Sequence, residues 1–172
     1  MYHRNTDPKF WETDYSQDHC NCGSFALDLT TWFSPYCEDN DNDDSYTNED
    51  RNQYIIDMYQ EGYSRERIKD TILRRDGEEI LRLCPWLEQV DEFNLPANER
   101  IIAYRLQLGD IWNCDVDTDF HFRVRIGGFW FEKCGEGPIH LCSNQEVTEP
   151  WVTSPQLIYD SDILYFRVKE KI

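Results

Sequence analysis

Hydrophobic residues recur with two different periods along the 172-residue chain, and the period changes near Pro96. Before Pro96, apolar residues lie three or four positions apart, which is typical of helices with one buried face. After Pro96, apolar and polar residues alternate, which is typical of strands with one buried face. This order predicts the α+β class, with N-terminal helices at about 21–93 followed by an antiparallel β-sheet at about 99–171.

Four helical segments are expected before Pro96, each identified by apolar side chains on one face. They are a segment with Phe25, Leu29 and Phe33 on one face that ends near Ser34, a segment around Tyr54–Tyr59 that Gly62 stops, a segment capped by Ser64 that Gly77 closes, and a segment from Ile80 to Val90 in which Pro85 imposes a kink or a fresh start.

The clearest strand pattern is a predicted β-hairpin at residues 120–134. The runs 120–126 and 129–134 alternate between apolar and polar residues and are separated by Gly127-Gly128, which suits a two-residue turn. Further strands are expected at 102–108 and 162–171. The turn sets the hairpin register, in which the opposite pairs are Ile126 and Phe129, Arg125 and Trp130, Arg123 and Glu132, and His121 and Cys134.

The charge of the chain is strongly acidic, with 34 acidic and 17 basic side chains and a net charge of −17. Such a surface repels phosphate backbones, so direct nucleic-acid binding is not expected. Acidic residues are densest in a predicted acidic loop at 38–50. A basic surface on another protein is the partner that this loop would fit, through Asp39, Asp41, Asp43 and Asp44. Calcium is not expected there, because Asp44 replaces the glycine that a calcium loop requires.

The sequence contains neither a run of 18 apolar residues nor an apolar leader in its first 20 positions. We therefore expect no membrane association and a location in the cytoplasm. The seven cysteines are an odd number and are expected to be mostly reduced thiols. We find no internal repeat and no interdomain linker, so the chain is interpreted as a single domain, 1–172.

One cysteine stands at the predicted start of a helix, in the run Asn21-Cys22-Gly23-Ser24. If Asn21 caps this helix, Cys22 is its first residue and faces unpaired backbone N–H groups. These groups stabilise a thiolate, which predicts a lowered pKa and a candidate nucleophile. The competing interpretation is a small buried cysteine in the core.

The predicted hairpin supplies a candidate base for such a nucleophile. Period-two alternation places His121, Arg123 and Glu132 on the polar face, with the carboxylate one diagonal step from the imidazole. Glu132 could therefore hold the tautomer of His121 and stabilise its charged form. The competing interpretations are a solvated strand histidine and a simple ion pair between Glu132 and Arg123.

The runs N-C-G-S-F-A-L at 21–27, D-F-H-F at 119–122 and W-F-E-K at 130–133 together resemble the papain-like fold, in particular NlpC/P60-type cysteine peptidases and amidases. The resemblance implies Cys22 as nucleophile, His121 as general base and Glu132 as third member. Gln17 is similar to the glutamine that helps build the oxyanion hole of papain-like peptidases. The same runs also resemble small tailed-bacteriophage proteins, which implies a viral protein acting in host cytoplasm.

Three functions therefore compete. The first is a phage-encoded thiol hydrolase of amide or isopeptide bonds, for which no metal and no cofactor are expected. The second is a non-enzymatic acidic viral inhibitor that binds a host nucleic-acid-binding or defence protein. The third is a structural zinc protein, because thiol and imidazole groups suit zinc; the two clusters considered are His19, Cys20 and Cys22, and Cys134, His140 and Cys142.

Overall fold

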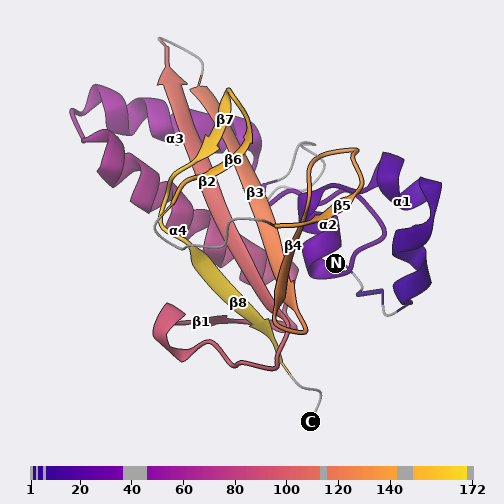
Figure 1. The fold of residues 1–172 in the computed structure, drawn as a ribbon. Helices are drawn as coiled ribbons and strands as arrows, with labels where there is room; N and C mark the ends of the chain where they lie inside the picture. The colour runs from indigo at the N-terminus through magenta and orange to yellow at the C-terminus, as the bar shows by residue number, and fades with distance from the viewer. Residues whose placement is uncertain are drawn as a thin grey trace.

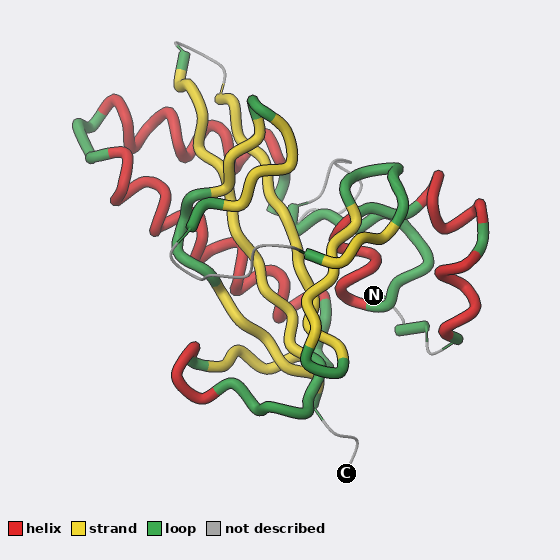
Figure 2. Tube along the Cα trace, in the orientation of Figure 1, coloured by secondary structure: helices red, strands yellow, loops and turns green. Residues whose placement is uncertain are grey.

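A six-stranded antiparallel sheet carries the fold in the computed structural model, which describes residues 2, 4, 5, 7–36, 46–112, 116–142 and 149–169 (Figures 1 and 2). In spatial order its strands are β1 (Leu87–Val90), β8 (Leu164–Val168), β2 (Ile101–Ile111), β3 (Val116–Ile126), β4 (Phe129–Lys133) and β5 (Ile139–Leu141). A separate hairpin consists of β6 (Trp151–Ser154) and β7 (Leu157–Tyr159).

The helices precede the sheet in the chain, as predicted for the α+β class. They are α1 (Asp14–His19), α2 (Cys22–Leu27), α3 (Asn48–Gln60) and α4 (Arg65–Leu83). A short 3-10 helix, η1 (Pro8–Glu12), comes before them, and another, η2 (Glu92–Asn94), follows β1. Figure 1 shows α3 and α4 behind the sheet, the β6–β7 hairpin in front of it, and α1 and α2 beside β4 and β5.

The main core lies between the helices and one face of the sheet. Ile68, Ile72 and Ile80 of α4 are buried there against strand residues that include Phe122 and Phe166. A second cluster lies on the opposite face, where Ile101, Ala103 and Tyr165 of the sheet meet Trp151 and Tyr159 of the β6–β7 hairpin. Both faces of the central strands are therefore covered.

A fully buried ion pair ties the helices to the sheet. Arg51 of α3 donates to both carboxylate oxygens of Asp76 in α4, at 3.0 and 2.8 Å. The hydroxyl of Tyr104 in β2 donates to the same carboxylate at 2.6 Å, and Arg51 also donates to Thr118 in β3. These bonds satisfy charges that would otherwise be costly to bury.

Two predicted helix ends are wrong, each because of contacts between residues that are distant in sequence. The helix expected to end near Ser34 is α2, and it ends at Leu27. Asp28 takes a left-handed conformation there (φ 58°) and forms ion pairs with Arg4 and Arg100. Gly77 does not close α4; it lies inside the helix, where a Cβ atom would come within 2.6 Å of Leu164 in β8.

The predicted fourth helical segment, Ile80–Val90, is divided between two elements. Its first residues end α4, and after Pro85 the chain continues as strand β1, which pairs with β8. The predicted end of the acidic loop at residue 50 is also wrong, since Thr47 caps α3 and residues 48–50 form its first turn. Asp39, Asp41, Asp43 and Asp44, proposed to bind a basic partner, lie outside the described residues.

Candidate functional site

The predicted hairpin forms with the register that the glycine turn indicates. Strand β3 pairs with β4 from Ile126 opposite Phe129 to Arg123 opposite Glu132. Because this pairing stops at Arg123, the preceding residues of β3 border a pocket of about 440 Å³. The pocket is lined by the start of α2, β3, the turn after β4 and the β6–β7 hairpin, through Asn21, Cys22, Trp32, Tyr36, Asp119, Phe120, His121, Cys134, Gly135, Thr153, Leu157 and Tyr159.

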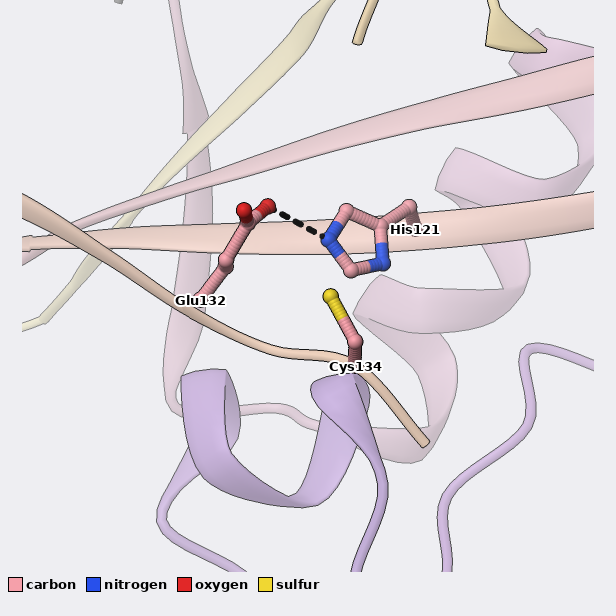
Figure 3. Close-up of side chains that lie close together, drawn as sticks. All are labelled: His121, Glu132 and Cys134. Atoms are coloured by element: carbon pink, nitrogen blue, oxygen red, sulfur yellow. Dashed lines mark hydrogen bonds and ion pairs between the residues drawn. The ribbon is translucent and has the colours of Figure 1, made fainter. Parts of the chain in front are cut away.

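His121 is held in this pocket by a carboxylate and by two aromatic rings. Its Nε2 atom lies 2.9 Å from Oε2 of Glu132 (Figure 3). The ring of Tyr159 stacks on the imidazole at 5.2 Å, and Trp151 contacts it edge-on at 6.1 Å. His121 is only 2% exposed, so the interpretation as a solvated strand histidine is wrong: the β6–β7 hairpin covers the polar face of β3.

Glu132 is ionised in this setting. Burial alone would raise the pKa of its carboxyl group, yet the hydrogen bond and charge of His121 and the charge of Arg123 lower it to about 2. The Nε atom of Arg123 donates to the same oxygen at 3.0 Å. Glu132 is thus a partner of Arg123, as one sequence interpretation held, and of His121 as well.

This geometry determines which nitrogen of His121 can accept a proton. An ionised carboxylate has no proton to give, so Nε2 of His121 is the donor in its bond with Glu132. In the neutral ring the proton then lies on Nε2, and Nδ1 keeps a free lone pair. Nδ1 is therefore the atom that can act as a base toward a group in the pocket.

Cys22 begins α2, as predicted, and its neighbours fix its place against β3. The side chain of Asn21 accepts from Ser24 N–H, and the Ser24 hydroxyl accepts from Asn21 N–H, which forms a capping box. Gly23 allows α2 to approach the sheet closely, since a Cβ atom there would lie 2.8 Å from Phe33 and 3.2 Å from Phe122.

The predicted low pKa of Cys22 is wrong. Burial raises the pKa of this thiol to about 12, against the opposing effect of its hydrogen bonds with the backbone of Phe122 and Gly23. The nearby charge of Asp119 raises it further. Cys22 is 6% exposed and belongs to the core cluster, so at neutral pH it is a thiol and not a preformed thiolate.

Cys22 and His121 lie at the same pocket but are not hydrogen-bonded to each other. Both line it, and no hydrogen bond between them occurs in the described part of the chain. Gln17 lies on α1, is half-buried, and is not a lining residue of this pocket. Its carbonyl accepts a hydrogen bond from Nζ of Lys133 at 2.9 Å, which ties α1 to β4, and its role at an oxyanion remains a prediction.

Cys134 is the site residue that the sequence reasoning did not assign to the catalytic group. Its sulfur and the ligand atoms of His121 and Glu132 all lie within 4.8 Å of one another (Figure 3). Burial raises the pKa of its thiol as well. The signal that could have identified it is the hairpin register, which already places Cys134 opposite His121.

Neither of the two clusters considered for zinc forms a three-residue ligand group in the described ranges. There, the one such group that could hold a metal is His121, Glu132 and Cys134. His140 pairs with Glu132 across β4 and β5 but is exposed, whereas Cys142 is buried. Cys134 therefore has different neighbours from those that its sequence spacing suggested.

Comparisons of the chain with protein-family models, with curated proteins and with solved structures find no match. The chemistry of this pocket is consequently the basis for assigning a function. Within the ranges that the structure covers, no helix has both the length and the apolar character needed to span a bilayer.

Proposed function

We propose that the protein is a thiol hydrolase of amide bonds, in which Cys22 is the nucleophile, His121 the general base and Glu132 the residue that orients the base. The observation that carries this proposal is the shared pocket: Cys22 and a histidine held by a carboxylate at 2.9 Å both line it. A thiol, a base and a group that orients the base are the parts that covalent acyl transfer needs.

Nδ1 of His121 takes the proton of the Cys22 thiol as the sulfur attacks the carbonyl carbon of the substrate. The C–N bond then breaks, and the leaving amine receives that proton. Water, deprotonated by His121, cleaves the resulting thioester and releases a carboxylic acid and the thiol. Because burial raises the pKa of Cys22 to about 12, proton transfer accompanies the attack and does not precede it.

Glu132 supports this cycle in two ways. Its bond to Nε2 keeps the ring in the tautomer whose Nδ1 can accept a proton, and its negative charge stabilises the imidazolium that then forms. Nε of Arg123 donates to the same carboxylate oxygen at 3.0 Å and helps to hold it in place.

The order of elements supports a papain-like arrangement for this hydrolase. Cys22 begins a helix that packs against β3 and β4, His121 lies on β3, and Glu132 lies on the adjacent strand β4. By the same resemblance, we propose that the enzyme acts in the cytoplasm of a phage-infected host. Gln17 would need to turn toward the pocket to serve the oxyanion.

The pocket walls favour an amide substrate with an apolar or aromatic group beside the scissile bond. Trp32 is 45% exposed, and Tyr36, Phe120 and Tyr159 add aromatic surface. Stacking and burial on such rings would position the substrate over the thiol.

The test uses the full-length reduced protein and a panel of fluorogenic peptide amides with different side chains before the scissile bond. We expect release of the fluorophore from members with an aromatic residue there, and a loss of at least about 10³-fold in kcat/KM in Cys22→Ser and in His121→Ala. The matched controls are Cys20→Ser, a buried thiol outside the pocket, and His19→Ala, an exposed histidine on α1. Turnover that survives Cys22→Ser, or no turnover by the wild type, would contradict the proposal.

A further inference from the structure

A second chemistry is possible at the same strand pair, because three different donor atoms converge there. The His121 ring, the Glu132 carboxylate and the Cys134 sulfur offer nitrogen, oxygen and sulfur within 4.8 Å of one another (Figure 3). They come from β3, from β4 and from the residue that follows β4, so the sheet fixes their relative positions. Imidazole, carboxylate and thiolate are the ligands that zinc-class ions take in proteins.

The spacing of these atoms is close to that of a tetrahedral ion site. With zinc–ligand distances of 2.0–2.3 Å, a ligating nitrogen and oxygen lie about 3.4 Å apart, and a nitrogen and sulfur about 3.6 Å. The His121 nitrogen and the Glu132 oxygen are 2.9 Å apart, and the sulfur lies within 4.8 Å of both. Side-chain rotations at Glu132 and Cys134, both half-buried, are enough to close the site around an ion.

Charge and access also suit a divalent cation. The ionised Glu132 and a Cys134 thiolate together balance two positive charges, so the filled site is neutral. Arg123 donates to Glu132 at 3.0 Å and orients the carboxylate. His121 and Cys134 both line the pocket, which gives an ion a way in and leaves the fourth position to water.

We propose that His121, Glu132 and Cys134 form a binding site for a zinc-class divalent ion. On binding, the Cys134 thiol releases its proton to solvent and the His121 proton moves from Nε2 to Nδ1, so that nitrogen, oxygen and sulfur each donate one electron pair. This proposal does not depend on the hydrolase, since Cys22 is not a ligand. The proposal does have a consequence for the hydrolase: a bound ion removes the free lone pair with which His121 would act as a base.

The experiment is a titration of metal-free, reduced full-length protein with Zn²⁺ in competition with a chromophoric chelator, together with the absorption spectrum of the Co²⁺ form. We expect one tight equivalent of Zn²⁺ and a thiolate-to-cobalt absorption band. Cys134→Ser and Glu132→Gln should each weaken binding at least about tenfold, and Cys134→Ser should remove the band. Cys20→Ser, His19→Ala and Cys22→Ser should bind as the wild type does.

The variants separate this site from other thiols and from the proposed hydrolase. One equivalent of Zn²⁺ held equally well by Cys134→Ser, or no tight equivalent in the wild type, overturns the proposal. Melting temperatures measured without metal identify variants that fail to fold; Cys134 is half-buried, and serine there retains the shape of the side chain. Because this experiment measures metal binding and not turnover, a negative result does not affect the test of hydrolysis with Cys22→Ser.

Discussion

Nε2 of His121 on β3 lies 2.9 Å from Oε2 of Glu132 on the neighbouring strand β4. The two faces of this hairpin pack against different parts of the protein. One face buries Phe122 and Val124 against the helices, and the other holds the imidazole beneath the β6–β7 hairpin. His121 is thus buried as thoroughly as the core, and Glu132 is half-buried beside it. The charge state of this pair consequently affects both stability and chemistry.

The first prediction concerns acid stability. The pKa of Glu132 in the folded protein is about 2, below the ordinary value of 4.5, so its contribution to stability is complete above pH 4.5 and is lost as pH falls through about 2. That contribution is up to about 3 kcal/mol. Glu132→Gln should lower the free energy of unfolding at pH 7 by this order and flatten its decline between pH 4.5 and 2. Urea unfolding across this pH range measures the free energy of unfolding, and substitution of the exposed Glu61 by Gln is the control. If the free energies of wild type and Glu132→Gln declined in parallel with pH, the prediction would be contradicted.

The second prediction concerns thiol reactivity. Since burial raises the pKa of Cys22 to about 12, its alkylation by iodoacetamide in the substrate-free protein should be slow at pH 7 and rise about tenfold per pH unit. Cys134 is less buried and should be modified first. Mass spectrometry of labelled peptides between pH 6 and 9 follows each thiol separately. A rate at Cys22 that levels off near neutral pH would reveal a preformed thiolate and refute the burial argument.

The third prediction concerns the buried pair Arg51 and Asp76. Asp76→Asn leaves the guanidinium without its counter-charge at a site with no solvent exposure, which should cost about 3–5 kcal/mol in the free energy of unfolding. Arg51→Met combined with Asp76→Asn removes both charges and keeps an acceptor for Tyr104, so it should be more stable than Asp76→Asn alone. Urea unfolding of the variants decides this, and a double variant no better than the single one would show that charge is not the cause.

The hairpin and its register could be predicted because their signals are local. Alternation over 120–134 assigns each side chain to a face, and Gly127 and Gly128, both with positive φ, fix the turn. The pairing of Arg123 with Glu132 follows from these facts alone, and with it the approach of Glu132 to His121. The start of α2 was equally local, since Asn21 forms the cap that the sequence indicated.

The remaining features depend on contacts that are distant in sequence. Asp28 ends α2 through ion pairs with Arg4 and Arg100. Gly77 has no side chain and so lets α4 pack closely against Leu164 of β8. None of these three partners could be predicted from a local pattern. The pKa of Cys22 was mispredicted for the same reason: a helix start was visible in the sequence, but the core that surrounds the sulfur was not.

The last prediction tests whether Cys22 and His121 act as one unit. In the proposed mechanism His121 acts on the Cys22 thiol and on the thioester that Cys22 forms, so once Cys22→Ser has removed the nucleophile, His121→Ala has little left to remove. The double variant should therefore be about as inactive as Cys22→Ser alone in the fluorogenic peptide assay, far from the product of the two single losses. Cys22→Ser combined with Cys20→Ser is the control for the loss of a second thiol, because it should leave the residual activity of Cys22→Ser unchanged. Multiplicative losses for Cys22 and His121 would mean that the histidine acts on structure or on substrate binding and is not the base for this thiol.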